Sequence, residues 1–188
     1  TQVGNIADYD AADITAGATA TDSTGTIKEI IQKAIDIHYD LIVDDPLVTI
    51  YGEGYVISDD VTFVASEFVV NREIVKNSSN VDIGYVYTLT GAGDYDNGQE
   101  LVTGHEVTIK VAFDVDDQVL GIVIPEDLYG HTSGTRLGKI QSYLDELVGK
   151  TVDEFVATLG DSEDLVAGVT YTKDLVDVLI AALIDEVN

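Results

Sequence analysis

Two stretches of the chain share residue types that could hold a phosphate through a hydroxyl group. They read DITAGATAT over residues 13–21 and DLVAGVTYT over residues 164–172. Each leads into a segment whose apolar spacing predicts a helix. The pattern therefore puts a threonine hydroxyl at a helix N-terminus, where backbone N–H groups and the helix dipole favour an anion. This chemistry suits a covalently held, phosphorylated cofactor.

The composition excludes several classes of protein. The 188 residues include 9 Lys and Arg against 35 Asp and Glu, a net charge of −26, so nucleic acid is not an expected partner. The absence of cysteine excludes disulfides, thiolate catalysis and cysteine-held metals or haem. No apolar run is long enough for a membrane-spanning segment. We expect a globular chain with the acidity of secreted proteins or of proteins that live in high salt.

The start of the chain is expected to differ from the rest. Residues 1–25 are rich in Ala, Thr, Asp and Gly, which predicts an extended arm. A capping box of Thr26 and Glu29 predicts a helix that ends near His38. The sequence begins at Thr1, without an initiator methionine or a signal peptide. We therefore expect a processed, exported chain.

The middle of the chain predicts strands and the end predicts helices. Runs of β-branched and aromatic residues predict strands over 47–51, 61–70, 81–90, 106–115 and 119–124. Apolar residues at helical spacing predict helices over 137–148, 152–159 and 172–187. A turn-rich loop is expected at 91–98 and a tight hairpin at Asp116-Asp117.

This order of elements predicts an α+β fold. We expect an antiparallel sheet with helices packed on one side, plus an N-terminal arm and helix. The chain then has two parts. Residues 1–40 form the arm and helix with the first motif, and residues 41–188 form the main domain.

The elements predicted from Gly84 to Val187 follow an order that can be compared with that of known protein families. A strand pair over 107–123 is followed by the loop HTSG at 131–134, a helix, Gly149-Lys150 and the second motif. In this order the chain resembles the FMN-binding domain family, which includes exported flavin subunits of the sodium-pumping NADH:quinone reductase and of the Rnf complex. The resemblance implies an FMN-carrying domain.

The resemblance also implies roles for single residues. Thr170 would be esterified to FMN through the phosphate by a separate exported flavin transferase, which uses FAD and Mg²⁺. Asp164 and Gly168 belong to this attachment motif, and Thr132 and Gly134 would line the flavin pocket.

Tyrosines are the candidates for stacking on the isoalloxazine ring. Tyr171 is preferred because it directly follows the attachment residue. The other candidates are Tyr85, Tyr87, Tyr95 and Tyr129.

The first motif is a second candidate attachment site. Thr19, with Asp13 and Gly17, stands closer to the family pattern, because Ala18 is retained there while Val169 replaces it in the second motif. Only 12 residues precede this motif, so its pocket must come from the same domain or from a neighbouring chain. A head-to-tail contact of the second kind can propagate into a flavin-lined filament.

We therefore expect an extracellular or cell-surface electron carrier with covalent FMN. Its partners would be the flavin transferase and redox proteins or extracellular acceptors. Two alternatives stay open. One is a structural surface or filament subunit that lost the flavin, which the departures at Ala167, Val169 and His131 support. The other is an FMN-dependent reductase that acts on a soluble acceptor.

Each candidate site also has a plain structural interpretation. A threonine after a glycine turn is a common helix cap. His131 either contacts the flavin edge or is a loop histidine satisfied by solvent. The three histidines lack ligand spacing and the 91–98 loop lacks the EF-hand pattern, so we assign no metal.

Overall fold

The computed structural model describes residues 30–33, 45–131, 134–160 and 169–188. The chain divides into two units, Thr1–Pro46 and Leu47–Asn188. Residues 30–33 are helical and lie within the helix predicted at 26–38. The predicted arm and the first motif lie outside the described residues.

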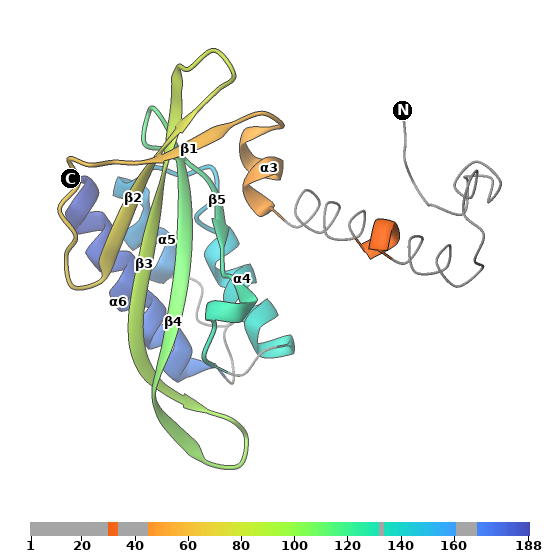
Figure 1. Ribbon diagram of the computed structural model, residues 1–188. Coiled ribbons are helices and arrows are strands. Elements are labelled where there is room, and N and C mark those ends of the chain that lie inside the picture. Colours follow the sequence, from red (N-terminus) through yellow and green to blue (C-terminus); the bar gives the residue numbers. More distant parts are fainter. Residues whose placement is uncertain (1–29, 34–44, 132–133, 161–168) are drawn as a thin grey trace, which may run out of the picture. The chain divides into compact units, whose positions relative to one another are not determined.

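The second unit is built on a five-stranded antiparallel sheet in the order β1-β2-β3-β4-β5 (Figure 1). Its strands are β1 (Val56–Asp59), β2 (Val69–Lys76), β3 (Asp82–Asp96), β4 (Leu101–Asp114) and β5 (Val119–Val123). Each strand pairs with the next one along the chain in antiparallel orientation. The predicted antiparallel sheet is confirmed.

Strands β3 and β4 form the longest pair. Their register runs from Gly84 opposite Asp114 to Asp96 opposite Leu101, so this hairpin projects beyond the rest of the sheet (Figure 1). We predicted a loop at 91–98 from its glycines and aspartates, but β3 continues to Asp96. The turn itself is confined to the four residues between the two strands.

The glycines of β3 are explained by helix α6 (Thr170–Val187). A Cβ atom at Gly91 would lie 2.9 Å from Leu179 Cδ2, and one at Gly93 would lie 3.1 Å from Leu175 Cδ2. These glycines therefore let α6 approach the strand closely. Composition alone cannot distinguish such a contact from a turn.

The turn between β4 and β5 is the predicted tight hairpin at Asp116-Asp117. Asp114 Oδ1 accepts hydrogen bonds from the backbone N–H groups of Asp116 and Gln118, both at 2.9 Å. Asp117 has a φ of 59°, a left-handed conformation that aspartate tolerates better than most residues. The local sequence therefore determines this turn.

Two predicted strands are wrong. The run at 47–51 belongs to helix α3 (Pro46–Tyr51), whose first residue is a proline, a favoured start for a helix. The run at 61–70 is mostly a connection whose last residues begin β2. A short run of β-branched residues does not separate strand from buried helix by periodicity.

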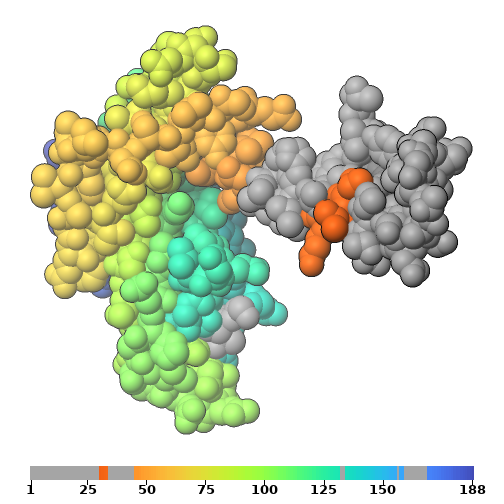
Figure 2. Space-filling view, in the orientation of Figure 1, coloured from red at the N-terminus to blue at the C-terminus, as the bar shows by residue number. Residues whose placement is uncertain are grey.

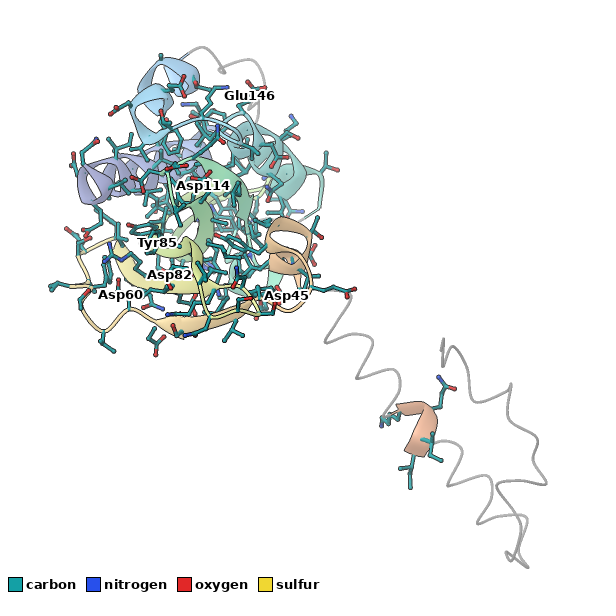
Figure 3. The ribbon with its side chains drawn as sticks, turned by 90° about the horizontal axis from the view of Figure 1, so that it is seen from above. Asp45, Asp60, Asp82, Tyr85, Asp114 and Glu146 are labelled. Atoms are coloured by element: carbon teal, nitrogen blue, oxygen red, sulfur yellow. The ribbon has the colours of Figure 1, made fainter. Side chains whose placement is uncertain are left out.

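The helices after the sheet are α4 (Thr135–Asp145), α5 (Phe155–Gly160) and α6, with short 3₁₀ turns η2 (Glu126–Leu128) and η3 (Val152–Glu154). They cover one side of the sheet, as predicted (Figures 1 and 3). The main core joins them to the odd-numbered residues of β4, which share one face of the sheet. Its largest fully buried side chains include Tyr143, Phe113, Phe155, Leu89, Ile109, Ile140, Leu179 and Ile180.

Helix α3 packs on the opposite face of the sheet. Leu47 contacts a second cluster that contains Val75, Val86 and Ala112. The Tyr51 hydroxyl lies 2.9 Å from Tyr85 O and 2.8 Å from Phe113 O, so its single proton is shared between backbone carbonyls of β3 and β4. The α+β class is confirmed, with this short helix added on the second face.

None of the helices in the described ranges is both long enough and apolar enough to cross a membrane.

Gly84 is predicted to be essential to the contact between β3, β4 and α3. A Cβ atom there would lie 2.0 Å from Phe113 O and 2.9 Å from Tyr51 Cε1. We expect Gly84→Ala to lower the free energy of unfolding by about 2–3 kcal/mol, because overpacking must shift backbone. Urea denaturation followed by circular dichroism measures this.

The matched control is Gly138→Ala in α4, where a Cβ atom meets no atom within 4 Å. Alanine should raise the free energy of unfolding there by about 0.5–1 kcal/mol, because it lowers the entropy of the unfolded chain. Equal effects of the two substitutions contradict the packing explanation.

Candidate functional site

A pocket of about 100 Å³ lies at the N-terminal end of α6. Figure 1 shows this end of α6 at the same end of the sheet as the β3–β4 hairpin. Figure 2 shows the hairpin beside α4 on the face in view. The lining residues are Tyr95, Asp96, Tyr129, Arg136, Val169, Thr170, Tyr171 and Thr172. They come from the end of β3, the segment from η2 to α4, and the start of α6.

Thr170 is the first residue of α6 and is exposed. The preceding residue, Val169, has no side-chain oxygen to cap the helix, and the first turn of α6 contains no acidic residue. Within the described residues, the N-cap of this 18-residue helix therefore gives its first N–H groups no side-chain hydrogen bond, and these groups carry a partial positive charge. An anion bound to the Thr170 hydroxyl would lie where this charge favours it.

Arg136 brings a positive charge to the same pocket. It is the second residue of α4, and its guanidinium donates a hydrogen bond to the backbone oxygen of Asp96 at the end of β3. A cation in the first turn of a helix opposes the helix dipole, so this position does not serve the stability of α4. Its guanidinium instead joins α4 to the hairpin and faces the pocket.

The aromatic residues of the pocket differ in how much surface they leave free. Tyr95 stacks on His131, with ring centroids 4.6 Å apart and an interplanar angle of 25°, and packs edge-on against His105. Tyr171 is 49% exposed. It is therefore the pocket aromatic with the most surface available to stack on a bound ring.

His131 links the start of α6 to β4. Its side chain is buried, with Nδ1 2.8 Å from Thr172 Oγ1 and Nε2 3.2 Å from His105 O. A carbonyl only accepts hydrogen bonds, so Nε2 carries the proton. Burial lowers the pKa of His131, which keeps the ring neutral at pH 7 and makes Nδ1 the acceptor for the Thr172 hydroxyl.

This geometry corrects the interpretation of His131 as a loop histidine satisfied by solvent, and its contact with the flavin edge stays a prediction. The residue is not satisfied by solvent, and it is absent from the lining of the pocket. It lies one layer behind the pocket and holds Thr172, the last threonine of the second motif. Of the two threonines of this motif in α6, Thr172 is buried and contributes to the packing of the helix, whereas Thr170 is exposed.

Tyr129 has a buried hydroxyl that makes no hydrogen bond within the described residues. Its side chain is only 7% exposed, and burial raises the pKa of the phenol. The Thr172 side chain and the charge of Arg136 oppose this rise. The backbone of Tyr129 is held against β4 by a bridge to Val107.

The predicted site residues have different outcomes. Thr170 and Tyr171 both line the pocket. Gly134, with a φ of 71°, directly precedes α4 and is not among the lining residues. Asp13, Gly17, Thr19, Thr132, Asp164 and Gly168 lie outside the described residues.

The tyrosine candidates are divided by the fold. Tyr95 and Tyr129 line the pocket, whereas Tyr85 and Tyr87 pack around Arg72, whose guanidinium carbon lies 5.7 and 5.8 Å from their ring centroids. Sequence reasoning missed Arg136. Its position two residues after Gly134, in a chain with only two arginines, was the available clue.

Comparisons of the chain with models of protein families, with curated proteins and with solved structures found no match. Within the described ranges, no three His, Asp or Glu side chains are grouped so that they could hold a metal ion. The chemistry of the pocket is therefore inferred from its own side chains.

His131 should titrate at low pH. Because burial lowers its pKa, the unfolded chain binds more protons than the folded chain between that pKa and about 6.5, the ordinary value. We expect this residue to reduce stability progressively as the pH falls below about 6.5. An NMR titration of the imidazole resonances, assigned through their loss in His131→Gln, measures the pKa directly. A midpoint at or above 6.5 contradicts the buried, neutral ring.

Proposed function

We propose that this protein is an electron carrier that holds FMN covalently on Thr170. The observation that carries the proposal is the position of this exposed threonine, at the start of α6 after an N-cap valine that has no capping side chain, and beside a pocket that contains Arg136. A phosphodiester bears one negative charge. Both the helix N-terminus and the guanidinium stabilise that charge.

Attachment requires a separate flavin transferase that supplies FAD. The Thr170 hydroxyl oxygen forms a bond to the phosphorus of the FMN half, the bond between the two phosphates breaks, and AMP leaves. The hydroxyl proton is lost to the transferase or to solvent. The exposure of Thr170 supports this step, because the modifying enzyme must reach the hydroxyl.

The size of the pocket favours a carrier. A volume of about 100 Å³ is well below the roughly 300–1,000 Å³ of sites that enclose a small-molecule ligand. It suits a phosphate or the edge of a ring, so much of the flavin would stay accessible. The bound flavin supplies the redox chemistry, and an accessible ring can exchange electrons with a partner protein in direct contact.

The proposed setting is extracellular or at the cell surface. A covalent ester keeps the flavin at fixed stoichiometry where a dissociating cofactor would be diluted. The net charge of −26 favours redox partners, or extracellular acceptors, that present positive charge.

The attachment site is tested by intact mass and peptide mapping after coexpression with a flavin transferase. We expect a mass increase of one FMN less one water on the peptide that contains Thr170, and its loss in Thr170→Ala. The peptide that contains Thr19 is mapped in the same experiment.

Thr135→Ala is the matched control, because Thr135 is also an exposed threonine at the first position of a helix but does not line the pocket. It should leave the modification intact. An unmodified parent chain, with an active transferase present, overturns the proposal and favours the structural subunit.

Arg136 should promote the modification. We expect Arg136→Gln to slow it about tenfold, because a hydrogen bond to a charged group contributes about 1.5–3 kcal/mol and 1.4 kcal/mol corresponds to a factor of ten. A time course of intact mass measures the rate. Lys139→Gln makes the same charge change on α4 away from the pocket lining and should leave the rate near that of the parent. Equal rates for the two variants contradict the role of Arg136.

A further inference from the structure

The hydroxyl of Tyr129 is an exception among the buried groups of the molecule. It is the single buried side-chain oxygen or nitrogen without a hydrogen-bond partner in the part of the chain that the structure describes. Buried polar groups are nearly always paired, because an unpaired one loses its hydration without compensation. An unpaired hydroxyl at a pocket therefore calls for a ligand that completes it.

Thr172 does not supply the missing hydrogen bond. The proton of its hydroxyl is donated to His131 Nδ1, at 2.8 Å, because His131 Nε2 carries the ring proton toward His105 O. Thr172 therefore has no proton left to donate to Tyr129. The Thr172 side chain lies near enough to the Tyr129 phenol to lower its pKa, but within the described residues the Tyr129 hydroxyl has no partner in full hydrogen-bonding geometry.

Tyr129 lines the pocket, and the groups near its hydroxyl line the same pocket. Apart from burial, the groups that shift its pKa are Thr172, Arg136 and Tyr95, and all three line the pocket. The backbone beside Tyr129 is held against β4, since Gly130 N–H donates to Glu106 O at 2.7 Å. Tyr129 is therefore a donor held in place before any ligand arrives.

We propose that the Tyr129 hydroxyl donates a hydrogen bond to an acceptor atom of the FMN attached at Thr170. This inference rests on the proposed function and adds a cofactor-contacting residue to it. Tyr129 and Thr170 line the same pocket, and FMN offers carbonyl, ring-nitrogen and phosphate acceptors. The hydroxyl is unsatisfied in the unmodified chain and becomes satisfied when the cofactor is attached.

The test is Tyr129→Phe in the full-length chain, produced with and without the flavin transferase and compared by thermal unfolding. Without flavin, Tm should stay constant or rise by about 2–4 °C, because the substitution removes an unpaired polar group. With flavin, Tm should fall by about 2–4 °C relative to the modified parent, because a hydrogen bond is lost. The sign of the change therefore depends on the cofactor.

Tyr143→Phe is the matched control. The Tyr143 ring is fully buried, and its hydroxyl already donates to Asp177 Oδ1 at 2.5 Å. Loss of this bond should lower Tm equally in both forms of the protein. The two variants thus separate a hydroxyl that serves the fold from one that serves the cofactor.

Intact mass is measured on each sample first. If Thr170 carries no FMN, the proposed function fails and this inference fails with it. If FMN is present but Tyr129→Phe changes Tm alike in both forms, the Tyr129 contact is overturned and the proposed function stands. Failure of Tyr129→Phe to fold without flavin also overturns the contact, because an unpaired hydroxyl cannot be required for folding.

Discussion

The close packing of α6 against the β3–β4 hairpin is the contact on which the rest of the site depends. Leu175 and Leu179 fill the space left by Gly91 and Gly93, so a long helix lies directly on the longest strand pair. Because the helix and the hairpin end at the same end of the sheet (Figure 1), the first turn of α6 reaches the end of β3. The pocket forms where these two elements meet.

Local positive charge distinguishes the pocket at the start of α6 from the rest of this acidic protein. In a protein with 35 acidic and 9 basic residues, an anionic ester would be repelled at most surface positions. The start of α6 differs because its first N–H groups and the Arg136 guanidinium act at short range. Short-range hydrogen bonds keep their strength in salt, whereas the field of the net charge is screened beyond about 8 Å at physiological ionic strength.

Much of the fold could be predicted because strong local patterns determine it. The hairpin at Asp116-Asp117 follows from aspartate side chains that bond their own backbone, and α6 follows from its apolar stripe. The errors arose where a tertiary contact decides the outcome. Gly91 and Gly93 indicate a turn when read locally, but they are strand residues because α6 packs on them.

For the candidate site, too, part could be predicted from the sequence and part is decided only by the tertiary structure. The sequence by itself determined that Thr170 stands at the start of a helix, because a motif and an apolar period are local properties. Only the tertiary structure decided that Tyr95, Tyr129 and Arg136 join it in one pocket. These residues come from separate elements, and their meeting depends on strand register and helix packing, which involve residues far apart in the chain. The unpaired hydroxyl of Tyr129 is likewise visible only in the fold, because burial and hydrogen bonding are properties of its neighbours.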